Sequence, residues 1–294
     1  MSAKRIEFKG AEQNALIADQ YGTGGQPVIL LHGGGQTRHS WAAAAERIAA
    51  LGHVVYSVDQ RGHGESAWVP SGNYMFVHFA QDLVALCQQV IAKHGAKPVV
   101  VGASLGGFAG MLAEGAEAPG NQAALVLVDI TPRVDMDGVY KILGFMGDRV
   151  EEGFGTVQEA ADAIARYLPN RSRPKDLSGL SKNLRLHADG RYRWHWDPAF
   201  LKVREHSDAE ITKRVQAGMI EAAENLKVPV LLLRGRNSEL VSMTHVEEFL
   251  DCVPHAKFTD IQDAGHMVAG DKNDVFAQAV EEFLTDLKSE ALIA

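Results

Sequence analysis

Residues 99–107 read Val-Val-Val-Gly-Ala-Ser-Leu-Gly-Gly, and this stretch decides how the rest of the chain is interpreted. A run of β-branched residues leads into Gly-x-Ser-x-Gly, and an Ala/Met/Leu-rich helical pattern follows, which predicts a strand, a tight turn and a helix. Gly102 and Gly106 flank the serine, and we expect that a Cβ at either position would press against the turn or the neighbouring strand. A turn serine that only caps the helix would explain Ser104 but not the glycines around it. Ser104 is therefore a candidate nucleophile at the carboxyl end of a sheet.

Length and composition describe an ordinary globular protein. The chain has 294 residues, of which 46% are hydrophobic, so it can bury a large core. Its formal net charge of −8 argues against nucleic acid or an anionic membrane as partner, because both select a basic face. Cys87 and Cys252 fall in amphipathic helical patterns, so no disulfide is expected. Without a signal-like or membrane-spanning apolar stretch, we expect a cytoplasmic monomer or small homo-oligomer.

Apolar runs of strand length alternate with helical patterns through most of the chain. The runs lie at 27–31, 53–59, 99–101, 123–128 and 228–234, and long helical patterns at 41–51, 74–94 and 243–252. Continuous apolar strands separated by helices predict an α/β fold whose mostly parallel sheet is flanked by helices, with a crevice at the strands' carboxyl ends.

This alternation breaks between about residue 133 and residue 226. The interval shows short helical patterns, a basic stretch at 170–175 and an aromatic segment at 192–198, and it is too long for a loop. We therefore expect a core domain formed by 1–132 and 227–294, with a mainly helical cap domain, 133–226, inserted over the crevice.

Two glycine-containing turns follow early strands. His32-Gly33-Gly34-Gly35 ends the run at 27–31, and three glycines leave backbone N–H groups open to a ligand, as an oxyanion hole requires. The turn at 59–66 reads Asp-Gln-Arg-Gly-His-Gly-Glu-Ser, and we expect Asp59 and Arg61 to lock it through charge-assisted hydrogen bonds.

Four motifs in this order resemble the α/β-hydrolase superfamily over essentially the whole chain. They are His-Gly-Gly-Gly at 32–35, Asp-x-Arg-Gly-x-Gly-x-Ser at 59–66, Gly-x-Ser-x-Gly at 102–106 and Gly-His at 265–266. The resemblance implies the α/β-hydrolase fold and a serine hydrolase with a catalytic triad. This chemistry needs no metal, and the sequence has no ligand cluster with metal spacing, so we expect neither a metal nor a cofactor.

A serine hydroxyl needs a base, and histidine has a suitable pKa. We assign His266, because it lies in the late turn that the family uses. His32 is the rival, and we expect it to brace the glycine run instead.

The tetrahedral oxyanion requires amide donors. We assign the amide of Leu105, the residue after the nucleophile, and that of Gly34, with Gly33 or Gly35 as alternatives.

The triad acid departs from the commonest pattern of the family, because Ser238 occupies the usual acid position. Asp129 ends the strand that follows the nucleophile helix, and a subset of similar esterases with Val-Asp-Ile-x-Pro there takes its acid from that strand. Glu239, one position beyond Ser238, is the alternative acid. We favour Asp129.

The expected reaction is hydrolysis of a small or medium carboxylic ester through a Ser104 acyl-enzyme. Candidate pocket walls, which packing within the cap would explain equally well, are Phe145, Met146, Trp194, Trp196 and Met267. Thioester, lactone or C–C bond hydrolysis and a chloroperoxidase-like perhydrolase activity would use the same triad. A receptor-like protein that binds its ligand with little turnover is the alternative from another class.

Overall fold

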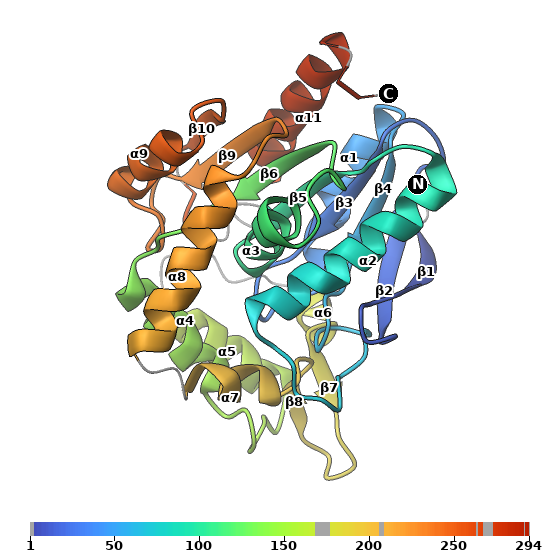
Figure 1. Cartoon of the computed structure of the whole chain (residues 1–294). Helices are drawn as coiled ribbons and strands as arrows, with labels where there is room; N and C mark the ends of the chain where they lie inside the picture. Colours follow the sequence, from blue (N-terminus) through green and yellow to red (C-terminus); the bar gives the residue numbers. More distant parts are fainter. Residues whose placement is uncertain are drawn as a thin grey trace.

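The centre of the molecule is an eight-stranded sheet with strand order β1-β2-β4-β3-β5-β6-β9-β10 (Figure 1). The computed structural model describes residues 3–167, 177–205, 209–262, 264–266, 273–290 and 292–293. β2 pairs antiparallel with β1 and β4, and the remaining neighbours are parallel, so the predicted α/β class is confirmed. The strands are β1 (Lys4–Lys9), β2 (Ala15–Tyr21), β3 (Pro27–Leu31), β4 (Val54–Val58), β5 (Val99–Ala103), β6 (Ala124–Val128), β9 (Val230–Gly235) and β10 (Lys257–Ile261).

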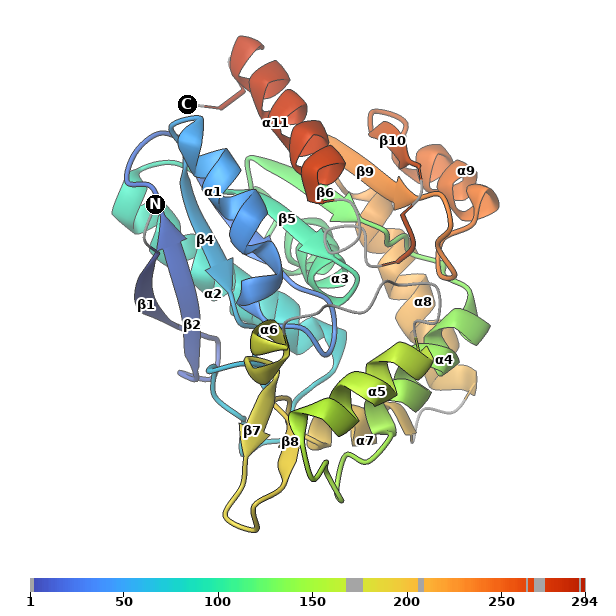
Figure 2. The same cartoon turned by 180° about the vertical axis from the view of Figure 1, so that it is seen from behind.

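Helices cover both faces of the sheet. In Figures 1 and 2, α2 (Phe76–His94) and α3 (Leu105–Leu112) lie on one face, while α1 (Ala42–Ala50) and α11 (Asn273–Ser289) lie on the other. Each face has its own hydrophobic cluster, and α9 (Met243–Cys252) contributes to the cluster that contains α2. Every residue of β3, β4 and β6 is buried, which explains their apolar sequences. The one polar residue in these three strands is Ser57 of β4, whose hydroxyl donates to the Arg38 carbonyl at 2.6 Å. A 3-10 turn, η1 (Arg38–Trp41), precedes α1, and a π-helical turn, η2 (Ala113–Glu117), follows α3.

The chain between β6 and β9 forms a layer beyond one end of the sheet, except for its last helix, which runs back beside α3 and η2 (Figure 1). It contains a two-stranded antiparallel hairpin, which the sequence pattern did not predict, although the segment is mainly helical as expected. The basic stretch at 170–175 lies outside the described residues. The elements are α4 (Met136–Gly147), α5 (Val157–Tyr167), α6 (Ser178–Ser181), β7 (Leu184–Leu186), β8 (Tyr192–Trp194), α7 (Ala199–Glu205) and α8 (Ala209–Glu224).

The turn at 59–66 is locked by charge-assisted bonds, but not by the expected partners alone. Asp59 binds Arg38 at 2.5 Å, and Arg61 binds Asp82 of α2 at 2.6 Å. These four groups are buried, where each charge needs an opposite charge close by. The turn is thereby fixed to η1 on one side and to α2 on the other.

Cys87 and Cys252 are free thiols, so the expectation of no disulfide is confirmed. Within the described ranges, no helix combines the length and apolarity that crossing a bilayer requires.

Candidate active site

Ser104 sits at the tip of the turn between β5 and α3. Its backbone has φ 47° and ψ −110°, a region that residues with a side chain rarely adopt. A Cβ on Gly102 would lie 2.3 Å from the carbonyl oxygen of Gly106, and one on Gly106 would lie 2.5 Å from that of Leu31. The expected reason for both glycines is confirmed, and the turn holds Ser104 at the end of the sheet.

His266 is carried by a turn packed on the end of β9. The Asn237 amide donates to the carbonyl of Ala264 at 2.9 Å, and a Cβ on Gly235 would lie 2.3 Å from the carbonyl oxygen of Gly265. This close approach brings the imidazole Nδ1 to 2.7 Å from Asp129 Oδ2. The structure therefore brings together the two residues that the sequence suggested as base and acid.

The Asp129 carboxylate is fully buried and accepts bonds from separate parts of the chain. Oδ1 accepts from the Gly235 amide at 2.9 Å, and Oδ2 accepts from the Ser238 hydroxyl at 2.5 Å as well as from His266. Both oxygens of the Asp129 carboxylate thus act as hydrogen-bond acceptors. With Nδ1 donating to Asp129, His266 keeps Nε2 as the acceptor for another proton.

Ser238 occupies the position where most of the family has the triad acid, and here its hydroxyl binds the Asp129 carboxylate. Its oxygen accepts from the amides of Leu240 and Val241 at 3.1 Å each while its proton points to Asp129. Sequence reasoning noticed Ser238 but did not foresee this contact.

Glu239, the alternative acid, takes no part in the contact with His266. It is half-buried, and its charge adds to burial in raising the pKa of Tyr167 to about 12. Asp129 rather than Glu239 therefore lies in position to orient His266.

Of the three amides in the glycine run 33–35, two already donate hydrogen bonds within the protein. Gly33 donates to Gln36 Oε1 at 3.0 Å, and Gly35 donates to His63 Nε2 at 3.1 Å. In the described part of the chain no acceptor takes the Gly34 amide, and Leu105 heads α3, where the first amides have no partner within the helix. Gly34 and Leu105 both line the cavity that contains Ser104. They are thus the amides open to a ligand atom at Ser104.

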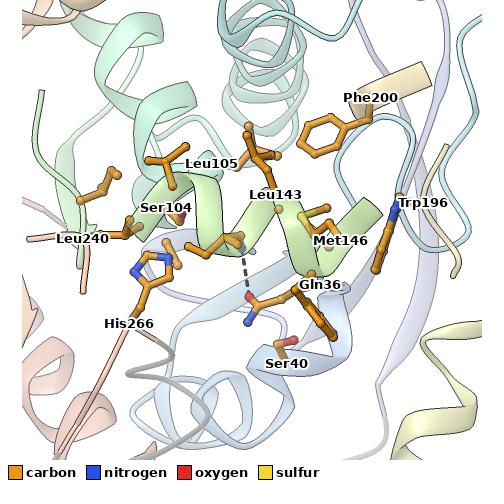
Figure 3. A pocket seen from close by; sticks show the side chains of 18 of the residues that line it. Gln36, Ser40, Ser104, Leu105, Leu143, Met146, Trp196, Phe200, Leu240 and His266 are labelled. Atoms are coloured by element: carbon orange, nitrogen blue, oxygen red, sulfur yellow. Dashed lines mark hydrogen bonds between the residues drawn. The ribbon is translucent and has the colours of Figure 1, made fainter. Parts of the chain in front are cut away.

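A cavity of about 390 Å³ lies between the sheet and the segment 133–226. Figure 3 shows His266 and Leu240 toward one end and Trp196 and Phe200 toward the other, with Ser104 and Leu105 along the wall. None of its described lining residues is Lys, Arg, Asp or Glu. Four of the proposed wall residues line it, and Met267 lies outside the described residues; the four are Phe145, Met146, Trp194 and Trp196.

Sequence reasoning missed much of the lining. Phe200, Tyr167 and Leu143 face the cavity, and Phe145 stacks on Tyr167 at 4.3 Å between ring centroids. Helical spacing marks an apolar face but does not tell whether that face lines a cavity or packs in a core.

The family model described as serine aminopeptidase, S33, matches residues 25–273. The chain belongs to this family. It is a serine hydrolase of the α/β-hydrolase superfamily, as the four motifs indicated.

Similar proteins agree with this assignment. This α/β-hydrolase is 28% identical to the esterase Rv0045c of Mycobacterium tuberculosis over 95% of this chain and 89% of the esterase. It is 30% identical to the sn-1-specific diacylglycerol lipase ABHD11 of Mus musculus over 87% of this chain and 80% of the lipase. The solved structure of E-2-(acetamidomethylene)succinate hydrolase, 21% identical, superposes with a TM-score of 0.80 over 97% of this chain and 100% of that one.

Proposed function

We propose that this ester-cleaving serine hydrolase attacks small or medium uncharged carboxylic esters with Ser104 and forms an acyl-enzyme. The contact of 2.7 Å between His266 and Asp129, on a cavity that Ser104 shares with His266, is the observation that supports the proposal most strongly.

The catalytic steps follow from these positions. His266 Nε2 takes the proton from Ser104 Oγ as Oγ bonds to the carbonyl carbon, and Asp129 stabilises the imidazolium that forms. The amides of Gly34 and Leu105 donate to the oxyanion. The C–O bond then breaks, and the alcohol leaves with the proton from His266. Water repeats the cycle on the acyl group and restores Ser104.

The proposed cap domain, 133–226, supplies most of the wall opposite the sheet. Its helices α4 and α5 contribute apolar side chains, and the segment Trp194–Trp196 contributes two stacked indoles with centroids 4.9 Å apart. An apolar chain gains free energy on entering such a cavity, whereas a charge would lose its hydration there without an opposite charge to replace it.

The lack of charge in the described lining favours neutral esters over two substrate classes that the comparisons name. A succinate derivative brings carboxylates, which call for cations in the site, and an aminopeptidase substrate brings an amino group, which calls for an acid. The described lining offers neither. Neutral esters fit it better than either class.

The test compares p-nitrophenyl hexanoate with mono-p-nitrophenyl adipate, an ester with an acyl chain of the same length that ends in a carboxylate. We expect the neutral ester to have a kcat/KM about 100-fold higher, since burying an unpaired charge costs at least a few kcal/mol. Ser104→Ala should remove turnover of both.

Equal rates for the two esters would contradict the substrate class. A wild-type protein as inert as Ser104→Ala toward all neutral esters would contradict the proposed reaction and favour a receptor-like protein that retains its ligand.

A further inference from the structure

Three buried histidines surround the glycine run, and the proposed mechanism uses none of them. His32 and His63 come from the core, while His195 is the residue between Trp194 and Trp196 in the sequence. The ring centroids of His32 and His63 are 5.1 Å apart, and those of His63 and His195 are 5.8 Å apart.

Each ring binds a different peptide unit of the glycine run. His32 Nδ1 donates to the Gly33 carbonyl at 2.8 Å, and His63 Nε2 accepts from the Gly35 amide at 3.1 Å. His195 Nε2 donates to the Gly35 carbonyl at 3.3 Å. Gly35 is thus held at both its N–H and its C=O, and its φ of +76° suits a glycine.

The second nitrogen of each ring binds the turn at 59–66. His32 Nε2 accepts from the Gln60 amide at 3.0 Å, His63 Nδ1 donates to the Arg61 carbonyl at 2.9 Å, and His195 Nδ1 accepts from the Gly64 amide at 2.7 Å. One nitrogen donates and the other accepts in every ring, so these partners assign each histidine as neutral with a single tautomer.

The geometry of the peptide bond connects this arrangement to catalysis. The Gly33 carbonyl and the Gly34 N–H belong to one planar peptide unit, and the next two units contain the groups that His63 and His195 bind. Glycines have the greatest backbone freedom, so the direction of the Gly34 N–H depends on restraints from outside the run. A phenylalanine could fill the space of His195, but it could make neither hydrogen bond.

We propose that His195 is a positioning residue for the oxyanion hole. Its two hydrogen bonds tie the segment 133–226 to Gly35 and Gly64, and they thereby direct the Gly34 amide toward Ser104. This inference rests on the proposed function.

Three substitutions separate the two hydrogen bonds of His195. His195→Phe removes both, His195→Gln places an amide N–H near the position of Nε2, and His195→Asn places its oxygen near that of Nδ1. We expect kcat for p-nitrophenyl butyrate to fall about 10- to 100-fold in His195→Phe with KM nearly unchanged, because a displaced donor weakens only transition-state binding. His195→Gln should recover most of kcat, and His195→Asn should recover little.

Two further readouts distinguish positioning from stability. Butylboronic acid forms a tetrahedral anionic adduct with an active serine, so its inhibition should weaken across the variants in proportion to kcat/KM. His187→Phe, a matched change on the same hairpin, should keep the wild-type kcat. All rates are measured well below each variant's Tm.

Wild-type kcat in folded His195→Phe would overturn the inference, and so would equal losses in His195→Gln and His195→Asn. If His195→Phe does not fold, the comparison of His195→Gln with His195→Asn decides. Failure of the proposed function is distinguishable, because the wild type itself would then show no turnover that depends on Ser104.

Discussion

At the scale of single residues, the charge of Asp129 should matter far more than that of Glu239. Asp129→Asn keeps the shape of the side chain but removes the charge that stabilises the imidazolium, so we expect kcat to fall by about 10³- to 10⁴-fold. Glu239→Gln should stay close to the wild-type value, because Asp129 and not Glu239 binds His266 Nδ1. Initial rates on p-nitrophenyl butyrate measure both. Comparable losses in the two variants would contradict the assignment of Asp129 as the acid.

Sequence reasoning reached Asp129 because the residue ends the strand after the nucleophile helix, where a subset of similar esterases carries its acid. The structure shows that this strand, β6, pairs directly with the nucleophile strand β5. It did not reach the bond from Ser238 to Asp129, which joins residues 109 positions apart. A local sequence pattern does not predict a hydrogen bond between residues so far apart in the chain. The ion pairs of Asp59 with Arg38 and of Arg61 with Asp82 were missed for the same reason, because these partners lie outside the turn at 59–66.

At the scale of elements, the turn between β5 and α3 tolerates no side chain at Gly106. Gly106→Ala would push a methyl against the carbonyl of Leu31, so we expect a loss of unfolding free energy of about 2 to 4 kcal/mol. Gly144→Ala is the matched control in α4, where a Cβ meets no atom within 4 Å. It should stabilise the protein by about 0.5 to 1 kcal/mol through helix propensity.

Urea unfolding of the two alanine variants checks this prediction. A Gly106→Ala protein as stable as the wild type would mean that β3 and α3 can move apart, against the close packing described here.

Sequence patterns predicted the central strands of the sheet well and the short hairpin poorly. β3 and β4 were predicted within a residue or two because strands covered on both faces are mostly apolar, with Ser57 the one polar residue of the two. The β7–β8 hairpin was missed because its strands have three residues each, too few to show an alternation. His195 was missed as well, because it is buried along with both neighbouring tryptophans and no polar face marks it.

At the scale of the whole molecule, buried neutral histidines should make the fold sensitive to acid. Burial lowers the pKa of His32, and it lowers that of His195 to about 3. The unfolded histidine titrates near 6.5, so below that pH the unfolded chain binds protons that the folded chain excludes. Unfolding free energy therefore falls with falling pH, and His195 alone accounts for about 2 kcal/mol at about pH 5.

Urea midpoints at about pH 7 and about pH 5 test this linkage. His195→Phe should lose less stability than the wild type between the two conditions, whatever its stability at neutral pH. Identical pH dependence in both proteins would show that His195 is not the neutral buried group described here.

Ser104 should carry the acyl group during turnover, and mass spectrometry of the quenched protein detects that group. Wild-type protein mixed with p-nitrophenyl hexanoate and quenched in acid during turnover should gain the mass of one hexanoyl group, and digestion should place that group on the peptide that contains Ser104. Ser104→Ala treated in the same way should gain none. A hexanoyl group on another residue, or turnover that persists in Ser104→Ala, would contradict the account.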